Sequence, residues 1–255
     1  MLTADPRFAP ERQAAILAFL ARDGRVVSTV LARELGVSID TIRRDLDELE
    51  ASGALKRVHG GAVRPLPGEP RFFDRLEEEG PAKERMAALA APLIADEEVV
   101  VLGGGTTMLQ LARALKPGLR ATVVTASLDV AQALRGHANI AVDVLGGRLD
   151  RESQTLTGVA TVEQLRRLRP GVCVLSPCGL DVADGLTLRA REEAQVVTAM
   201  VERARRTIVL AGAAKLGTAG PYIVAPAERV DVLVTDAPEE RCAPFRAVGI
   251  EVITG

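Results

Sequence analysis

The chain has 255 residues, 47% of them hydrophobic and 26% charged, which excludes an intrinsically disordered protein and fits one or two domains. Its formal net charge of -2 excludes a global attraction for nucleic acid, so any DNA-binding surface must be local. The sequence has no uninterrupted run of about eighteen apolar residues and no signal-peptide pattern, and therefore predicts a cytoplasmic protein that does not enter the membrane.

Three helices and a hairpin are predicted at the N-terminus. The apolar stripe of the first helix ends before a glycine, and Ser28 is expected to cap a second helix over residues 29–35. Ser38 is expected to cap a third helix that continues to about residue 52. Because a short turn containing Gly36 joins the second and third helices, the pattern predicts a helix-turn-helix.

The third predicted helix has two opposed faces. Ile42 and Leu46 fall on an apolar face, while Thr41 and Arg44 fall on the opposite, polar face. The second helix of a helix-turn-helix enters the major groove, so we expect Thr41 and Arg44 to read base edges. Arg43 lies on the flank of this face and suits a phosphate contact.

A basic hairpin follows the third helix. It contains Lys56, Arg57 and His59, and Gly60-Gly61 is expected to form its tight turn. This segment is predicted to be a basic wing beside the helix-turn-helix. The residues predicted to lie at the DNA are Ser28, Ser38, Asp40, Thr41, Arg43, Arg44, Lys56, Arg57, His59, Gly60 and Gly61.

The same charges also fit an ordinary helix surface. Arg43 with Asp47, and Arg44 with Asp40 or Glu48, have the spacing of surface ion pairs. This alternative stays open, but the caps, the glycine turn and the adjacent basic hairpin favour DNA binding.

The composition changes after the hairpin. The stretch 64–81 holds four prolines and two glycines, which is typical of a linker. Residues 1–64 carry a net charge of +1 and the remainder carries -3. The sequence thus predicts a winged helix-turn-helix domain over 1–64, with the motif at about 26–45, a linker over 65–80, and an α/β effector-sensor and oligomerisation domain over 81–255.

Short apolar runs alternate with helical segments in the rest of the chain. Their continuous apolar character is typical of strands buried on both faces, so we expect a mostly parallel α/β sheet. The predicted strands are Val99–Leu102, Ala121–Val124, Ile140–Val144, Val172–Leu175, Thr207–Leu210, Val230–Val234 and Glu251–Ile253. The predicted helices are Thr107–Leu115, Asp129–Leu134, Val162–Leu168 and Glu193–Arg203.

Polar loops follow several of these strands. The carboxyl ends of parallel strands meet at one edge of a sheet, where ligands usually bind. The segment GGGTT at 103–107 runs from a strand into a helix, so its backbone N–H groups suit a phosphate, although it matches neither a P-loop nor a dinucleotide motif. The predicted effector-binding residues are Gly104, Gly105, Thr106, Thr107, Ser127, Gly146, Gly147, Arg148, Asp181, Glu193 and Lys215.

Some of these residues also have simpler interpretations. Arg148 and Lys215 fit solvated surface cations, and Asp181 and Asp184 fit turn formers. Their convergence at one edge of the sheet is the argument for a ligand site.

The sequence predicts no cofactor and no metal site. The three cysteines, Cys173, Cys178 and Cys242, lack metal-ligand spacing, and only two histidines are available to join them. We expect buried, reduced thiols.

Several segments resemble one protein family. Residues 26–63 contain the elements SxxTIRRDL and HGGA and resemble the N-terminal domain of the DeoR family of bacterial transcriptional regulators. The resemblance continues through TASLDVA at 125–131 and LGGRLDR at 145–151. It implies a winged helix-turn-helix joined to a sensor domain similar to ribose-phosphate isomerases and CoA transferases. It also implies a repressor of carbohydrate metabolism genes that is relieved by a phosphorylated sugar.

The sequence departs from that family pattern in the ligand loops. Gly103 stands where many members have an acidic residue, Ala126 where they have Asn, and Val197 where a Lys is frequent. The stretch Gly212–Lys215 replaces the usual Asp-x-Ser-Lys. These changes remove polar partners for a sugar phosphate, which leaves open a different ligand or weak binding.

Three functions are therefore compared. The favoured one is a DNA-binding regulator that responds to a small anionic metabolite. The second is a sugar-phosphate isomerase-like or CoA transferase-like enzyme, with Asp181, Asp184 or Glu193 as its base. The third is a regulator that has lost effector binding. For a regulator the expected partners are a double-stranded DNA operator, a sugar phosphate or related effector, and further copies of the chain, because two-fold operators need paired domains.

Overall fold

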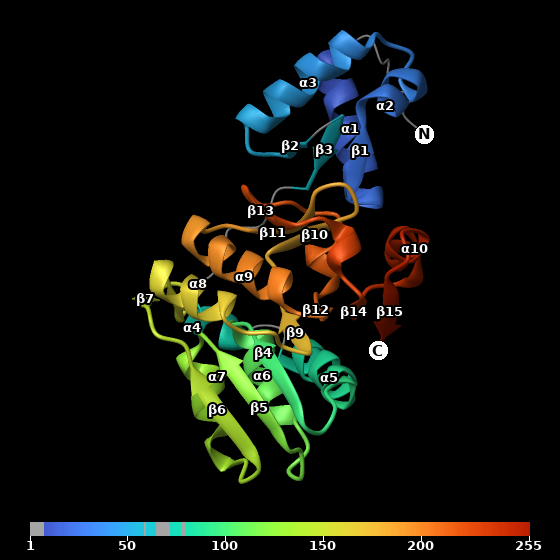
Figure 1. Cartoon of the computed structure of the whole chain (residues 1–255). Coiled ribbons are helices and arrows are strands. Elements are labelled where there is room, and N and C mark those ends of the chain that lie inside the picture. Colours follow the sequence, from blue (N-terminus) through green and yellow to red (C-terminus); the bar gives the residue numbers. More distant parts are fainter. Residues whose placement is uncertain (1–7, 59, 65–71, 78–79) are drawn as a thin grey trace.

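The computed structural model describes residues 8–58, 60–64, 72–77 and 80–255. Its N-terminal part combines three helices with a small antiparallel sheet, which has the strand order β1-β3-β2 (Figure 1). The elements are α1 (Ala9–Asp23), β1 (Arg25–Val27), α2 (Ser28–Glu34), α3 (Ile39–Ala51), β2 (Lys56–Val58) and β3 (Gly61–Val63).

Helices α2 and α3 form the predicted helix-turn-helix. The apolar face of α3 buries Ile42 and Leu46 in a core that includes Ile16 and Leu20 of α1. Gly36, in the turn, has a φ of 64°, a left-handed conformation that glycine adopts without steric cost. The predicted fold of this domain, a winged helix-turn-helix, is confirmed.

Ser28 does not cap α2, so this prediction is wrong. The N-cap is Val27, because the unpredicted strand β1 leads directly into the helix. Ser28 is buried, and its backbone N–H donates to the carbonyl oxygen of Gly60 at 2.8 Å. Ser28 thus connects the start of α2 to the hairpin.

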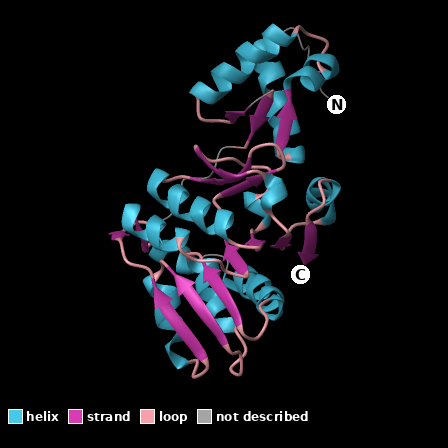
Figure 2. Cartoon of the chain, in the orientation of Figure 1, coloured by secondary structure: helices cyan, strands magenta, loops and turns pink. Residues whose placement is uncertain are grey.

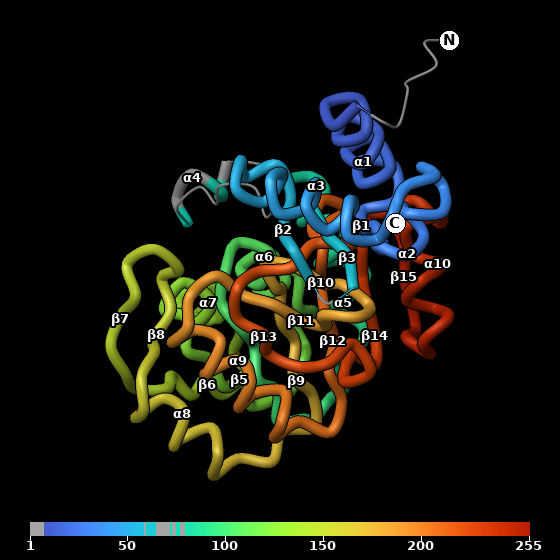
Figure 3. The backbone as a smooth tube through the Cα atoms, turned by 90° about the horizontal axis from the view of Figure 1, so that it is seen from above, coloured from blue at the N-terminus to red at the C-terminus, as the bar shows by residue number. Residues whose placement is uncertain are grey.

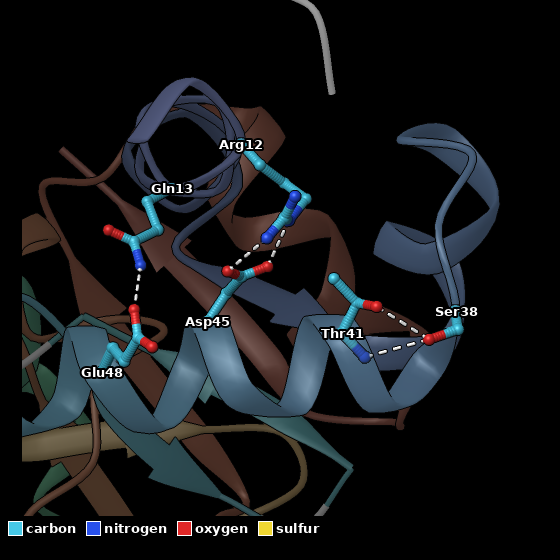
Figure 4. Close-up of polar contacts among 6 residues, drawn as sticks. All are labelled: Arg12, Gln13, Ser38, Thr41, Asp45 and Glu48. Carbon is cyan, nitrogen blue, oxygen red and sulfur yellow. Dashed lines mark hydrogen bonds and ion pairs between the residues drawn. The ribbon is translucent and has the colours of Figure 1, made fainter. Parts of the chain in front are cut away.

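An ion pair is buried between α1 and α3. Arg12 Nε and Nη2 donate to the two carboxylate oxygens of Asp45 at 2.5 and 2.8 Å, and both side chains are less than a tenth exposed (Figure 4). On the same two helices, Gln13 donates to Glu48 at 2.7 Å in an exposed position. The two-point contact of the buried pair fixes how α1 lies on α3.

A seven-stranded parallel sheet forms the centre of the second domain. Its strand order is β15-β14-β12-β9-β4-β5-β6. The strands are β4 (Glu98–Leu102), β5 (Ala121–Thr125), β6 (Ile140–Val144), β9 (Val172–Leu175), β12 (Arg206–Leu210), β14 (Val232–Thr235) and β15 (Glu251–Thr254). All seven predicted strands, and the parallel sheet, are confirmed.

Helices cover both faces of this sheet (Figure 2). One face packs on α5 (Gly80–Ala90), α6 (Thr106–Ala114) and α7 (Leu128–Ala133). The other packs on α8 (Val159–Arg166), α9 (Arg191–Arg203) and α10 (Glu239–Ala247). Short 3-10 helices lie at η1 (Ala91–Leu93), η2 (Leu134–Gly136), η3 (Ala213–Lys215) and η4 (Ala227–Arg229).

Two small antiparallel sheets were not predicted. One is a hairpin of β7 (Arg148–Asp150) and β8 (Thr155–Thr157). The other has the order β10-β11-β13 and consists of β10 (Gly179–Asp181), β11 (Gly185–Leu188) and β13 (Tyr222–Ala225). This second sheet lies between the winged domain and the large sheet (Figures 1 and 3).

The interval predicted as a linker is partly folded. It contains α4 (Phe72–Glu77), in which Phe72 is fully buried and donates its backbone N–H to the carbonyl oxygen of Glu152 at 3.3 Å. The prolines suggest a linker, but the aromatic ring supplies an apolar anchor. Residues 65–71 and 78–79 lie outside the described residues.

The three cysteines are thiols and form no disulfide. Cys173 and Cys242 are buried and Cys178 is half-buried. Burial raises the pKa of Cys173 to about 12, so its thiol stays protonated and unreactive at neutral pH. Among the described residues, no helix is both long and apolar enough to cross a bilayer.

The buried ion pair gives a stability prediction. Asp45→Ala deprives the buried Arg12 guanidinium of its carboxylate and is expected to destabilise the winged domain by about 3 kcal/mol. The matched control, Glu48→Ala, removes an exposed contact between the same helices and is expected to change little. Hydrogen exchange of α1 and α3 in the full chain measures both. Equal exchange rates in the two variants would contradict the prediction.

Candidate DNA interface and ligand pocket

The N-terminus of α3 is capped as predicted. The Ser38 hydroxyl accepts the backbone N–H of Thr41 at 3.1 Å. The Ser38 and Thr41 hydroxyl oxygens also lie 2.8 Å apart (Figure 4). This cap fixes the first turn of the helix, which is the part that enters the major groove in a helix-turn-helix.

The ion pairs on α3 differ from those that spacing suggested. Arg43 donates to Asp40 at 3.0 Å, whereas Asp47 accepts from Arg57 of the wing at 2.5 Å. Arg44 is exposed and makes no hydrogen bond or ion pair with another described residue. The alternative in which Arg44 pairs with Asp40 or Glu48 is therefore wrong.

The wing is a tight hairpin that packs on β1. Val58 pairs with Gly61 across a two-residue turn, in which Gly60 has a φ of 79°. The prediction that Gly60 and Gly61 form the turn together is wrong for Gly61, which is the first residue of β3. A Cβ atom at Gly61 would collide with the carbonyl oxygen of Val26, so only glycine fits at this close approach. His59, predicted to contact DNA, lies outside the described residues.

The basic side chains of the wing are held by carboxylates of α3. Lys56 Nζ donates to Glu50 at 2.9 Å, and the backbone N–H of Arg57 donates to the same oxygen at 3.0 Å. The hydrogen bond from Lys56, followed by that from Arg57, lowers the pKa of Glu50. The wing and α3 thus form one charged surface, on which acidic side chains accompany most of the basic ones.

The glycine loop after β4 leads into α6 as predicted. Gly105 is the N-cap, with a φ of 93°, and no side chain caps the helix. A Cβ atom at Gly104 would collide with the methyl group of Thr155. The side chains of Thr106 and Thr107 are buried, so the loop offers chiefly the uncapped N–H groups of the first turn to an anion.

A small pocket lies beside this loop. Its volume is about 10 Å³, which is room for about one water molecule. Lys215 reaches it by donating from Nζ to the Ser176 hydroxyl at 3.0 Å. The lining residues are Gly103, Gly104, Leu175, Ser176, Pro177, Leu186, Leu188, Glu193, Val197 and Val224. Two positions that depart from the family pattern, Gly103 and Val197, therefore line this pocket.

The structure brings only some of the predicted effector residues to the pocket. Gly104 and Glu193 line it, and Lys215 contacts it through Ser176. Sequence reasoning missed Ser176, which follows β9 directly; the rule that selected the other loops, a polar residue at the end of a buried strand, would have found it.

Other predicted effector residues have structural partners outside the pocket. Ser127 caps α7, and the N–H of Gly146 donates to Gln164. Arg148 is exposed and ion-paired with Glu192 at 2.5 Å. A Cβ atom at Gly147 would collide with the Thr161 hydroxyl.

Asp181 lies at the junction of the two domains and not in the pocket lining. Its carboxylate, only 4% exposed, accepts from Arg25 Nη1 of β1 at 2.5 Å. The same oxygen accepts the backbone N–H groups of Ala183 and Asp184 at 2.9 and 3.2 Å. The turn interpretation of Asp181 is thus confirmed, with an interdomain ion pair added to it.

A second strip of contacts follows the 3-10 helix η3. Thr218 forms an isolated β-bridge with Arg64 of the winged domain, and Gly217 packs on Gly24. Arg241 of α10 donates to the carbonyl oxygen of Leu216. Burial, and then the nearby charge of Arg64, lowers the pKa of Arg241. The winged domain therefore rests on the loops that follow β9 and β12 (Figure 3).

Known proteins match both domains. The DeoR-like helix-turn-helix domain matches residues 12–66, and the DeoR C terminal sensor domain matches residues 78–237. The chain is 34% identical over 229 residues to the HTH-type transcriptional regulator GolR of Listeria innocua, with 89% of this chain and 90% of that protein covered. It is 33% identical over 228 residues to the HTH-type transcriptional repressor GlcR of Bacillus subtilis, with 89% and 88% covered.

Among solved structures, ribose 5-phosphate isomerase A from Neisseria gonorrhoeae matches 52% of each chain with a TM-score of 0.36 and 15% identity. The family matches define a helix-turn-helix transcriptional regulator with a C-terminal sensor domain. The chain belongs to the DeoR family. Among the described residues, no group of three or more His, Cys, Asp or Glu side chains is arranged to hold a metal ion.

The interdomain ion pair gives a second prediction. Arg25→Ala leaves the buried Asp181 carboxylate without its cation and is expected to weaken the junction by about 2 kcal/mol. Faster hydrogen exchange in β1 and β10 of the full chain would show this loss. The control is Arg22→Ala, which removes an exposed ion pair with the adjacent Asp23 and is expected to leave both strands unchanged. No difference between the variants would mean that the pair does not hold the junction.

Proposed function

We propose that this protein is a sequence-specific repressor that binds a two-fold DNA operator through residues 1–64 and senses a small anionic metabolite through residues 81–255. It acts in the cytoplasm. The observation that carries the DNA-binding part is the exposed Arg44 in the capped N-terminal half of α3, which makes no hydrogen bond or ion pair within the described part of the chain. Thr41 lies one turn earlier, and we expect the two side chains to read base edges in the major groove.

Phosphate contacts come from the surface formed by the wing and α3. Arg43, Lys56 and Arg57 exchange their carboxylate partners for DNA phosphates on binding. The acidic partners oppose DNA at the same surface, so sequence-independent affinity is modest and specificity depends on base contacts. Three phosphate contacts predict a log-log salt slope of about -2.7 per domain.

The DNA-reading role of Arg44 is tested by Arg44→Ala. Loss of one bidentate base contact is expected to cost about 1 to 3 kcal/mol of discrimination between the operator and mismatched DNA. Fluorescence anisotropy at several salt concentrations, with the DNA upstream of the protein's own gene, measures affinity and salt slope. The matched control is Arg113→Ala, which removes an exposed arginine of α6. Equal discrimination in both variants would contradict the docking of α3.

The sensor part of the proposal rests on the groups around the pocket. Lys215, Glu193 and the uncapped amides of α6 supply a cation, a hydroxyl acceptor and an anion site next to one another. This combination suits a phosphorylated sugar or a related anionic metabolite. Apolar Val197 and small Gly103 reduce the polar contacts available, which favours a less hydroxylated ligand than a typical sugar phosphate.

Ligand binding must open the pocket. A volume of about 10 Å³ admits no metabolite of this class, so Lys215 or helix α9 has to move. Gly217 and Thr218, which touch the winged domain, follow Lys215 within three residues. A ligand that displaces η3 therefore favours a different position of the winged domain. Such a ligand binds one arrangement of the two domains more tightly than the other, and regulation requires this difference in ligand affinity.

The geometry favours a regulator over an enzyme on the same scaffold. Of the three carboxylates considered as a catalytic base, Asp181 is charge-paired with Arg25 at the domain junction. Glu193 is the one that lines the pocket. The matched relatives are transcriptional regulators.

The sensor is tested by thermal shift with a panel of sugar phosphates. A ligand at about 100 times its dissociation constant stabilises the folded chain by about 2.7 kcal/mol. Lys215→Ala is expected to abolish this shift, whereas Lys116→Ala, at an exposed position after α6, retains it. A panel without any shift would support a regulator that has lost effector binding, and turnover of a pentose phosphate would support the enzyme.

A further inference from the structure

One face of the sensor domain carries an open groove between α8, α9 and β13. Its volume is about 580 Å³. Val159, Tyr222 and Ile223 lie along it, and Val159 and Ile223 are 79% and 67% exposed. The groove and the small pocket share no lining residue, although α9 and β13 contribute to both. Exposed apolar side chains gathered at a groove are typical of an interaction surface.

A single stripe of α9 lines this groove. Arg191, Gln195, Thr198 and Glu202 occur at spacings of four, three and four residues, so all four fall on one side of the helix. Ala194 and Ala199 also line the groove, but they are buried and belong to the core beneath α9. The surface that the helix presents is therefore polar, with Arg191, Gln195 and Glu202 exposed.

The residues of this stripe are complementary to the same residues of a second, antiparallel copy of α9. The point between residues 196 and 197 is the midpoint of two pairs, which are Arg191 with Glu202 and Gln195 with Thr198. When two copies of α9 run antiparallel about that point, each arginine faces a glutamate. Each Gln195 amide faces a Thr198 hydroxyl, which donates to the carbonyl oxygen of Val224 in its own chain and can accept from the amide. A two-fold axis produces this reciprocal pairing.

The charges at the ends of the stripe fit the second copy better than their own helix. Arg191 lies in the first turn of α9, where the helix dipole disfavours a cation, and Glu202 lies in the last turn, where it disfavours an anion. Neither side chain forms an ion pair with another described residue. In an antiparallel pair, each charge lies beside the favourable dipole end of the facing helix.

We propose that the α8–α9–β13 face is a two-fold interface between two copies of this chain, with the α9 helices antiparallel. The axis brings α8 against α8 and β13 against β13. The second copy therefore covers Val159 of α8 and Ile223 of β13. The proposal rests on the proposed function in one respect: a two-half-site operator needs two winged domains held by one two-fold axis.

Charge reversal tests this pairing by sedimentation velocity of the full chain. The wild type is expected to sediment as a multimer of even copy number. Each single variant, Arg191→Glu or Glu202→Arg, places like charges opposite each other at two symmetric points. Each is therefore expected to halve the mass of the sedimenting particle. The double variant R191E/E202R restores opposite charges and is expected to recover the wild-type mass.

Three results would overturn the proposal: a monomeric wild type, single variants with the wild-type mass, or a double variant that stays dissociated. Arg113→Glu is the control for a charge reversal at another exposed helix position. Circular dichroism of each variant shows that the chain remains folded.

DNA binding is measured separately. The single variants should keep wild-type affinity for one half-site and lose at least tenfold in affinity for the two-half-site operator. If the wild type binds no operator while the masses change as expected, the proposed function fails and the interface stands.

Discussion

All seven parallel strands of the sensor domain end at one edge of the sheet, and this constraint places the pocket and the domain junction side by side. The segment after β9 contains Ser176 at the pocket and, five residues later, Asp181 of β10 at the junction. The segment after β12 contains Lys215 of η3 and then Gly217. Each segment therefore has one end at the pocket and the other against the winged domain.

The junction is held by few but well-defined contacts. The Arg25–Asp181 pair is largely buried and shares its acceptor oxygen with two backbone N–H groups, so the carboxylate cannot turn without losing three hydrogen bonds. The Thr218–Arg64 bridge adds a backbone contact. In contrast, Arg64 and Arg241 repel each other at the same place. The junction thus combines a buried, well-oriented ion pair with a repulsion between like charges.

The sequence predicted the elements that are governed by local patterns. The seven buried strands follow from continuous apolar runs, and the cap at Ser38 follows from its position before an amphipathic helix. Strands β1 and β10 were missed because three residues are too short to show a period. The role of Asp181 was missed for another reason: its partner Arg25 is 156 residues away, and no spacing rule connects the two. Likewise, the pairing of Asp47 with Arg57 required the wing to fold back on α3.

Helix α9 connects the pocket with the face proposed to join two copies. Glu193 and Val197 line the pocket from one side of the helix, while Arg191, Gln195, Thr198 and Glu202 lie in the groove on another. Because a thirteen-residue helix moves largely as a rigid body, a ligand that displaces Glu193 and Val197 also shifts the stripe. In the proposed two-fold assembly the axis would repeat that shift in both copies. The spacing of half-sites on DNA is fixed by the helical repeat, so an assembly whose two winged domains changed their spacing would bind the operator less tightly.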